Sequence, residues 1–541
     1  MDASLFFPLD RQKLKTGNLP LLPLICRANT AVPLRQQAWS SRFMHCSTNR
    51  IWVCFIVLAT LLVVAGTPRP RMGYAPPPLQ RAPQVNAPMP EREFRALWIA
   101  TIDNIDWPSK PNLTPAQQKA ELLTILDRAA RLKFNAVFLQ VRPECDALYS
   151  SRIEPWSECL TGQMGRSPGF FYDPLSFAIT EAHKRGLELH AWFNPYRVRH
   201  DASAPASPRH ISRARPDLVR QYGKLLLLDP SDKGARDYSL SVIMDVVRRY
   251  DIDGALFDDY FYPYPDKKLP QQAFDAIDES NWRRYLAKGG KLSRPDWRRE
   301  NVNAFVQQTY RYIKAEKPWV RFGISPFGIW RPGQPASVHG LDAYNQLYAD
   351  ARAWLINGSV DYLAPQLYWH TDDPDRKFRD LLKWWNEQNT LSRHVWPGLA
   401  QMGEASEQVT ITRQMSSVPG EFFWHSRAIL ANSNGVASSL QRIYAQPALV
   451  PALPWLSKSA PQSPALWGSR NASRIKINWK TSARDINRWV VQKKFRAHWE
   501  TEIVPLSQTS LQLKAPIPET IAVRAVDRYG NMSPPSVFTG N

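Results

Sequence analysis

Short apolar runs alternate with amphipathic stretches between residues 92 and 456. Leu122, Ile125 and Ala129, for example, recur at helical spacing, and the runs have the length of buried strands. Strands that alternate with helices form a parallel sheet, and eight such units over this length favour a closed (β/α)8 TIM-type barrel. The eight strand candidates, each but the first preceded by a helical stretch, are RALWIAT (95–101), NAVFLQV (135–141), LELHAWF (187–193), GALFD (254–258), RFGISPF (321–327), DYLAPQLYW (361–369), HVWPGLA (394–400) and GEFFWHS (420–426).

Start and stop signals bound several of the predicted helices. Thr114-Pro115 and Asp173-Pro174 each place a capping side chain before a proline at the first helical position. Gly186 and Gly358 stand where two helices should end. The helices are therefore predicted to fill the gaps between the strands, as a barrel requires.

The pattern changes after PALVPALPWL (447–456). RIKINWK (474–480), RWVVQKK (488–494) and TIAVRAVDRYGNMSPPS (520–536) alternate at a period of two, with turn residues between them. Residues 457–541 are therefore predicted to form a small β-sandwich. The last stretch resembles the final strands of a fibronectin type III module, a kind of module that usually positions or binds.

An uncharged segment, residues 51–66, follows a basic extension over residues 1–50. As a helix its sixteen residues would reach about 24 Å, short of a hydrocarbon core of roughly 30 Å. That length suits the core of a signal peptide with Met44 as an alternative start, or an uncleaved membrane anchor; a buried core helix is the third reading. Residues 67–91 are a Pro-rich linker. The barrel is thus expected outside the cytoplasm: periplasmic, secreted or anchored to the inner membrane.

Positive charge gathers at the two ends of the chain. The net charge is +21, and residues 458–541 hold thirteen basic against five acidic side chains. This distribution argues against a single nucleic-acid-binding face, although a basic C-terminal module could contact an anionic cell wall or membrane surface. No glycine-rich phosphate-binding motif follows any predicted strand, so nothing supports nucleotide binding.

Polar and aromatic residues follow the predicted strands at their C-terminal ends, where TIM barrels place their active sites. Paired carboxyl groups are what acetal hydrolysis needs, and aromatic rings stack on sugar faces. Each residue also has a structural reading, such as a helix cap, a turn or part of a core lid. His190 and His425 lack metal-ligand spacing, so we expect hydrogen-bonded polar residues there, and neither a metal nor a cofactor. The candidates are Asp103, Arg142, Glu144, Asp146, Trp192, Asn194, Tyr196, Arg197, Asp258, Asp259, Tyr260, Gln366, Tyr368 and Trp369.

Two cysteines, Cys145 and Cys159, lie in the globular part of the chain, fourteen positions apart. In an oxidising compartment a bond between them would close one loop and contribute about 3 kcal/mol through chain entropy. Two free buried thiols are the alternative, and the spacing does not decide between them.

Six motifs together resemble the glycosyl hydrolase-like family ten, a group of exported bacterial proteins: RALWIATIDNIDWP, LQVRPECDALYSSRIEPWSECLTG, AHKRGLELHAWFNPYR, DIDGALFDDYFYP, RFGISPFGIWRPG and DYLAPQLYW. The resemblance implies a TIM-type barrel over residues 92–456 that hydrolyses a β-linked bacterial glycan, with peptidoglycan strands stripped of their peptides as the substrate class. It places Asp258 and Asp259 as the acids of the fourth strand. Cys145 is a departure, because the family pattern has a glycine before Asp146.

The resemblance implies cleft positions at Arg142, Asp146, Asn194, Tyr196, Arg197, Gln366 and Tyr368, and it does not identify the general acid. We expect Asp258 or Asp259 to act as nucleophile or base, with Asp146 or Glu144 as the acid. The alternative function is a non-catalytic scaffold that binds cell-wall glycan through the same side chains. A metal-dependent sugar deacetylase would need a His/Asp ligand cluster that the sequence does not contain.

Overall fold

The computed structural model describes residues 86–169 and 172–539. The predicted signal or anchor segment and the basic extension before it lie outside these residues, as does most of the Pro-rich linker. Within the described part of the chain, every helix is too short or too polar to span a bilayer.

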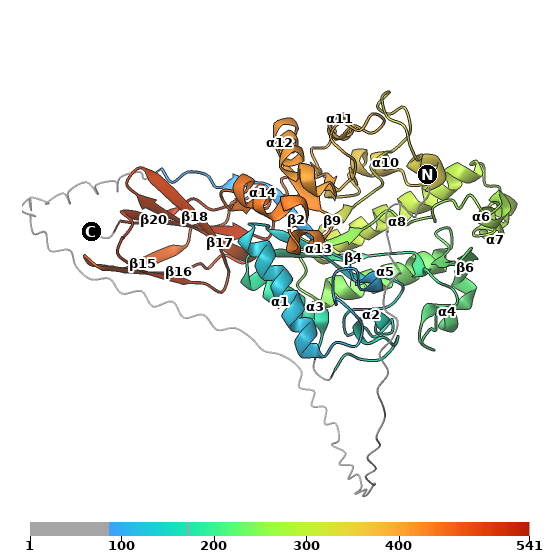
Figure 1. The fold of residues 1–541 in the computed structure, drawn as a ribbon, viewed down its shortest axis with the longest axis horizontal. Helices are drawn as coiled ribbons and strands as arrows, with labels where there is room; N and C mark the ends of the chain where they lie inside the picture. Colours follow the sequence, from blue (N-terminus) through green and yellow to red (C-terminus); the bar gives the residue numbers. More distant parts are fainter. Residues whose placement is uncertain (1–85, 170–171, 540–541) are drawn as a thin grey trace, which may run out of the picture. The chain divides into compact units, whose positions relative to one another are not determined.

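The centre of the fold is a closed barrel of parallel strands (Figure 1). The sheet order is β11-β10-β9-β8-β4-β3-β2-β13-β12. The first and last strands in this order, β11 and β12, are two pieces of the same chain segment, so the sheet closes on itself. The eight predicted strand segments and the α/β TIM-like barrel are thus confirmed. The strands are β2 (Phe94–Ile99), β3 (Ala136–Arg142), β4 (Glu188–Phe193), β8 (Gly254–Phe257), β9 (Arg321–Ile324), β10 (Tyr362–Leu363), β11 (His394–Val395), β12 (Gly398–Leu399) and β13 (Gly420–Phe423).

Helices connect the strands and begin where their caps predict. The side chain of Thr114 accepts from the backbone of Gln117 at the start of α1, and Asp173 caps α3 in the same way. Gly186 takes a left-handed φ of 72° after α3. The helices are α1 (Pro115–Arg131), α2 (Glu158–Thr161), α3 (Pro174–Lys184), α4 (Ile211–Ala214), α5 (Lys233–Arg249), α6 (Gln271–Asp275), α7 (Glu279–Ala287), α8 (Arg294–Glu316), α9 (Ala343–Gln346), α10 (Ala351–Ile356), α11 (Phe378–Glu387), α12 (Ala405–Met415), α13 (Ser426–Leu430) and α14 (Val436–Ile443).

Two insertions enlarge the loops that follow β4 and β8. The first contains α4 and a small antiparallel sheet in the order β5-β7-β6, and the second contains α6 and α7. Both start at the C-terminal ends of barrel strands, so they build up the rim on which the candidate residues lie. The strands of the small sheet are β5 (Arg197–Arg199), β6 (Val219–Tyr222) and β7 (Leu225–Leu228).

Large rings fill the barrel interior, and glycines on neighbouring strands make room for them. A Cβ on Gly254 would lie 2.3 Å from the ring of His190, and one on Gly323 would lie 2.1 Å from the ring of Tyr362. The two rings hydrogen-bond to each other, with 2.9 Å between His190 Nδ1 and the Tyr362 hydroxyl. His190 is therefore a hydrogen-bonded core residue, as predicted.

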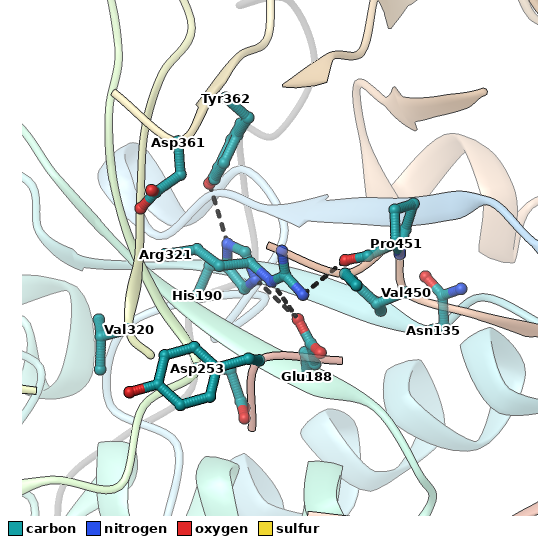
Figure 2. A network of polar contacts seen from close by, with 12 residues as sticks. Asn135, Glu188, His190, Asp253, Val320, Arg321, Asp361, Tyr362, Val450 and Pro451 are labelled. Carbon is teal, nitrogen blue, oxygen red and sulfur yellow. Dashed lines mark hydrogen bonds and ion pairs between the residues drawn. The ribbon is translucent and has the colours of Figure 1, made fainter. Parts of the chain in front are cut away.

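A buried polar network closes the N-terminal end of the barrel (Figure 2). Arg321 lies 3.4 Å from the carboxylate of Glu188 and donates to the carbonyl of Pro451 at 2.8 Å. His190 Nε2 lies 3.3 Å from the same carboxylate. Burial favours the neutral form of Glu188, but the positive charge of Arg321 and the other partners outweigh it and lower its pKa to about 2.

The C-terminal residues form two antiparallel sheets with a shared apolar core, as the period-two pattern predicts. Ile477 and Trp479 of one sheet pack against Trp489, Val491 and Val523 of the other. The first sheet consists of β15 (Ala465–Arg470), β16 (Arg474–Lys480) and β19 (Ser510–Lys514), and the second of β18 (His498–Pro505), β17 (Ile486–Phe495), β20 (Thr520–Asp527) and β21 (Ser536–Phe538).

The second of these sheets contacts the N-terminal end of the barrel. Arg488 lies 3.4 Å from Glu188, at the start of β4, and Arg528 lies 2.7 Å from Asp251, just before β8. Val490 packs with Leu449 of β14 (Ala448–Leu449), which pairs with β1 (Glu91–Arg92). The C-terminal sheets therefore lie at the end of the barrel opposite to the C-terminal ends of its strands.

Candidate active site

A chain of side-chain hydrogen bonds crosses four strands and ends at Asp258, directly after β8. The amide of Asn194 donates to Asp258, and the amide of Gln140 donates to Asn194 at 2.7 Å. Gln140 is held in turn by the backbone N–H groups of Thr101 and Ile102, each at 2.9 Å. The amide side chains of Gln140 and Asn194 each have one orientation in which they donate to the next residue of this series and accept from the previous one. Residues at the ends of the barrel strands therefore fix the position of the Asp258 carboxyl.

Asp258 is 4% exposed, and its Oδ1 has no hydrogen-bond partner among the described residues. Burial raises the pKa of Asp258 to about 7, and the negative charge of Asp259 acts in the same direction. The positive charge of Arg197 and the hydrogen bond from Asn194 oppose this rise. A carboxyl whose pKa lies near neutral pH is suited to take up or release a proton there, as general acid–base catalysis requires.

Asp259 lies beside Asp258 and accepts a hydrogen bond from the hydroxyl of Tyr264. Burial raises the pKa of Asp259, while Tyr264 and the side chain of Gln366 stabilise its charged form. Sequence reasoning missed Tyr264. The aromatic run YFYPYP after the two acids could have indicated a ring at this position, but the sequence does not show which of its rings contacts the carboxylates.

Two of the candidate rings keep part of their surface exposed at this mouth. The guanidinium of Arg197 lies 4.9 Å from the centre of the Tyr260 ring. Burial raises the pKa of the Tyr368 hydroxyl well above its usual value, and the negative charges of Asp259 and Asp258 act in the same direction. Tyr260, Tyr368 and Arg197 are half-buried, and Gln366 is too.

Other candidate side chains are buried and contact the protein itself. Trp192 packs edge-on against Trp98 inside the barrel, with 4.4 Å between ring centres. Tyr196 packs against Phe305, and Trp369 is 8% exposed. These three rings support the mouth from below and have little or no face free for a ligand.

Arg142 is also fully buried. It forms a 2.7 Å ion pair with Glu154 and donates to the backbone carbonyls of Asn194, at 2.6 Å, and Pro195, at 3.0 Å. Arg142 therefore holds the loop that carries Asn194 and Arg197, instead of pointing into the mouth.

A second group of acids lines a cavity of about 280 Å³ formed by the loops after β2, β3 and β4. Its lining includes Asp103, Glu144, Asp146 and His200. Arg197 contacts both parts of the candidate site, because it donates to the carbonyl of Pro143, which lines this cavity, at 3.0 Å, and its guanidinium lies against Tyr260, which follows the first pair of acids.

Glu144 and Asp146 differ in their affinity for protons. Burial favours neutral Glu144, but His200, at 2.6 Å, and Arg199, at 3.2 Å, outweigh it and lower the pKa of Glu144. Burial and the charge of Glu144 raise the pKa of Asp146 to about 7. Sequence reasoning missed Arg199 and His200, since nothing in the pattern indicates that the turn after β5 folds back onto Glu144.

Cys145 and Cys159 are free buried thiols in the structure, which is the second of the two alternatives that their spacing leaves open. The Cys145 sulfur points toward Arg142, 3.0 Å away, while Cys159 lies on α2. Cys145 has a φ of 53°, a left-handed conformation that glycine adopts most easily. A glycine would adopt it without strain, which fits the glycine that the motif resemblance implies before Asp146.

His425 follows β13, which lies opposite β8 across the closed barrel. Its Nδ1 lies 2.6 Å from Asp106, whose carboxylate also accepts from the backbone N–H groups of Ala100 and Arg427.

Residues 86–169 and 172–539 contain no group of three or more His, Cys, Asp or Glu side chains that could hold a metal ion.

Comparisons with known proteins identify relatives of this chain. The model of the family described as glycosyl hydrolase-like 10 matches residues 93–411. The glycosyl hydrolase YngK of Bacillus subtilis is 42% identical over 398 residues, 70% of this chain and 76% of YngK. The glycosyl hydrolase DigH of Escherichia coli K12 is 34% identical over 377 residues, 65% of this chain and 83% of DigH.

Among solved structures, the glycoside hydrolase domain of PgaB (BpsB) from Bordetella bronchiseptica aligns with a TM-score of 0.41 and 16% identity, covering 66% of this chain and 99% of that one. The family model covers more than half of the chain, and the match to YngK extends over more than two thirds of that protein. The chain therefore belongs to the glycosyl hydrolase-like 10 family.

Proposed function

We propose that this protein is a glycoside hydrolase that cleaves a bacterial cell-wall glycan, namely peptidoglycan strands that lack stem peptides. The observation that carries the proposal is the Asp258 carboxyl, which is buried, fixed by Asn194 and has a pKa of about 7. Family membership and the names of two relatives, both called glycosyl hydrolases, support the reaction class. The glycan class rests on the six-motif resemblance.

In the proposed mechanism, Asp258 acts as the base or nucleophile and Asp146 as the acid. Arg197 and Asn194 stabilise the charged form of Asp258, while the negative charge of Glu144 favours the protonated form of Asp146. Asp146 would give its proton to the leaving glycosidic oxygen, and Asp258 would attack the sugar or activate water. Glu144 is the weaker candidate for the acid because its pKa is lowered.

The remaining polar and aromatic groups of the mouth would hold the polymer. Tyr260 and Tyr368 offer partly exposed rings for the apolar faces of sugars, and Gln366 and Arg197 offer donors for hydroxyl groups. Asp103 is exposed on the rim of the cavity, where it can accept from a sugar hydroxyl.

The proposal includes export and a cell-wall location. Residues 51–66 would direct the chain out of the cytoplasm as a signal peptide or anchor, with the Pro-rich linker as a tether. The C-terminal sheets would act as a fibronectin-like positioning module. N-terminal sequencing of the mature protein tests this part, because a cleaved signal leaves a new terminus near the end of residues 51–66 and an anchor does not.

The substrate is tested by incubating residues 86–541 with three polymers: stripped peptidoglycan strands, strands that keep their peptides, and an unrelated β-glucan. Mass analysis should find shorter oligosaccharides from the stripped strands and little or no product from the other two. Equal cleavage of the β-glucan would overturn the substrate class. Binding to stripped strands without any product would favour the non-catalytic scaffold.

A further inference from the structure

The β15–β16–β19 sheet has one face that is turned away from the shared core. Along β16 the buried Ile475, Ile477 and Trp479 alternate with Arg474, Lys476 and Lys480, which are exposed. Successive side chains of a strand point to opposite faces, so the three cations share the outer face of the sheet. The other sheet of the module contacts the barrel, whereas these three cations are exposed to solvent.

The register brings further side chains onto the same face. Lys514 of β19 lies directly opposite Arg474, and Trp467 of β15 lies directly opposite Asn478. Trp467 is 48% exposed, although it is a large apolar ring, and Lys480 Nζ lies 5.9 Å from the ring centre. We call this surface, made by Trp467, Arg474, Lys476, Asn478, Lys480 and Lys514, the basic face.

The positive charge of the basic face is not balanced within its own sheet. The three strands contain no acidic residue, and among residues 86–169 and 172–539 none forms an ion pair with Arg474, Lys476, Lys480 or Lys514. The second sheet differs, since its Lys493 pairs with Glu500 at 3.2 Å and with Glu502 at 2.6 Å.

Like charges directly opposite each other on neighbouring strands destabilise a sheet. Arg474 and Lys514 occupy such a position. The four unpaired cations therefore repel one another in the isolated protein, and a ligand that supplies negative charge would reduce this repulsion.

We propose that the basic face binds an anionic glycan. Trp467 would stack on the face of a sugar ring, Asn478 would donate to its hydroxyl groups, and the four cations would pair with acidic groups repeated along the polymer. The choice of a glycan rests on the proposed function. Peptide-free peptidoglycan strands fit, because each muramic acid residue carries a carboxylate. The module would hold the polymer on the protein while the barrel cleaves it.

The test measures binding of the full chain in an Asp258→Asn background, so that cleavage does not remove the ligand. The probes are peptide-free strands, the same strands with their carboxylates amidated, and phosphatidylglycerol vesicles. The test variant carries Lys476→Gln, Lys480→Gln and Lys514→Gln. The control carries Lys184→Gln, Lys233→Gln and Lys383→Gln, so it loses the same charge. These three lysines lie on the barrel helices, and their side chains are 60%, 81% and 69% exposed.

The test variant should bind the charged strands about tenfold more weakly than the control, and raising the salt concentration should remove this difference. Amidated strands should bind both proteins equally. Trp467→Ala should weaken binding to both kinds of strand, whereas Tyr312→Ala, at a ring that is 47% exposed on α8, should not.

Equal affinity of the test variant and the control for charged strands would overturn the proposal. Binding to the vesicles alone would also overturn it, in favour of a lipid surface. Turnover of short soluble fragments by the lysine variant with an intact Asp258 should equal that of the wild type. If the wild type shows no turnover, the proposed function fails, but the binding comparison still decides the role of the basic face.

Discussion

At the scale of single residues, the proposed chemistry depends on how neighbours set the proton affinity of a buried carboxyl group. Asp258 would have a pKa near 4 in an unfolded chain. In the barrel, burial and Asp259 raise it to about 7 against the opposing effects of Arg197 and Asn194. Each contribution comes from a named side chain, so each can be changed separately.

Changing the two neighbours should move the pKa of Asp258 in opposite directions. Asn194→Leu removes a hydrogen bond that favours the charged form, so the pKa should rise. Asp259→Asn removes a nearby negative charge, so the pKa should fall. Carbon-13 NMR titration of the aspartate carboxyls, with the signal assigned by its absence in Asp258→Asn, measures both shifts. Shifts of the same sign in the two variants would contradict the assigned contacts.

The raised pKa of Asp258 also predicts a pH-dependent effect on stability. Between pH 4 and 7 the folded protein binds a proton that the unfolded chain releases, so this group stabilises the fold at low pH and loses that effect as pH rises through 7. Asp258→Asn removes the cost of a buried charge. It should raise the free energy of unfolding at pH 8, by an amount on the order of 2–4 kcal/mol, and have little effect at pH 4. Urea denaturation at the two pH values measures this; an equal effect at both would contradict it.

The sequence predicted the position of the two adjacent acids better than the roles of their neighbours. Asp258 and Asp259 follow an apolar run, and a barrel places such residues at its mouth. Arg142 has the same kind of position, yet it turns inward to Glu154. A charged side chain after a strand can face either way, and only the tertiary partners decide. Tyr264 was missed for the same reason.

At the scale of secondary-structure elements, the barrel strands were predictable because both of their faces are buried. β3, for instance, is buried at all seven of its positions, so the apolar run marks the strand directly. The insertions were not predicted. β6 and β7 are only partly buried, and β5, which pairs with β7, is three residues long. Strands this short are not marked by a recognisable alternation of apolar and polar residues in the sequence.

Glu188 joins β4 to both β9 and β17, because its carboxylate faces Arg321 and Arg488. Glu188→Gln leaves two buried cations short of their anion, which should lower the free energy of unfolding by about 3 kcal/mol at pH 7. The pKa of Glu188 is lowered to about 2, so its stabilising effect is present above pH 4 and is lost as pH falls through 2. Urea denaturation between pH 7 and 2 measures the difference from wild type, which should shrink toward pH 2.

Glu316→Gln is the matched control for this prediction. Glu316 pairs with Arg248 at 2.8 Å, but both side chains are exposed to solvent, at 37% and 55%. An exposed pair of this kind contributes less than about 1 kcal/mol. A loss in Glu188→Gln no larger than in the control would show that the network at the N-terminal end of the barrel does not stabilise the fold.

At the scale of the whole molecule, the two ends of the barrel differ: one end carries the candidate active site, and the other end contacts the C-terminal sheets. Asp258 and Asp259 follow β8 and Asp146 follows β3 at one end of the barrel, while the opposite end contacts the C-terminal sheets through Arg488 and Arg528. The sequence predicted both the barrel and the C-terminal sheets, because the spacing of apolar residues changes to a period of two after residues 447–456. It could not predict which sheet of the module faces the barrel, since both sheets alternate in the same way.

The central claim is that Asp258 takes part in cleaving a glycan that the mouth also binds. It is tested most directly by measuring the hydrolysis rate of stripped peptidoglycan strands and the affinity for them in Asp258→Asn, with Asp266→Asn, an exposed acid of the same loop, as the control. The account predicts that Asp258→Asn lowers the rate by about 10² to 10⁴-fold while affinity stays within a few-fold of wild type, and that the control changes neither. A variant that cleaves as fast as wild type would contradict the account.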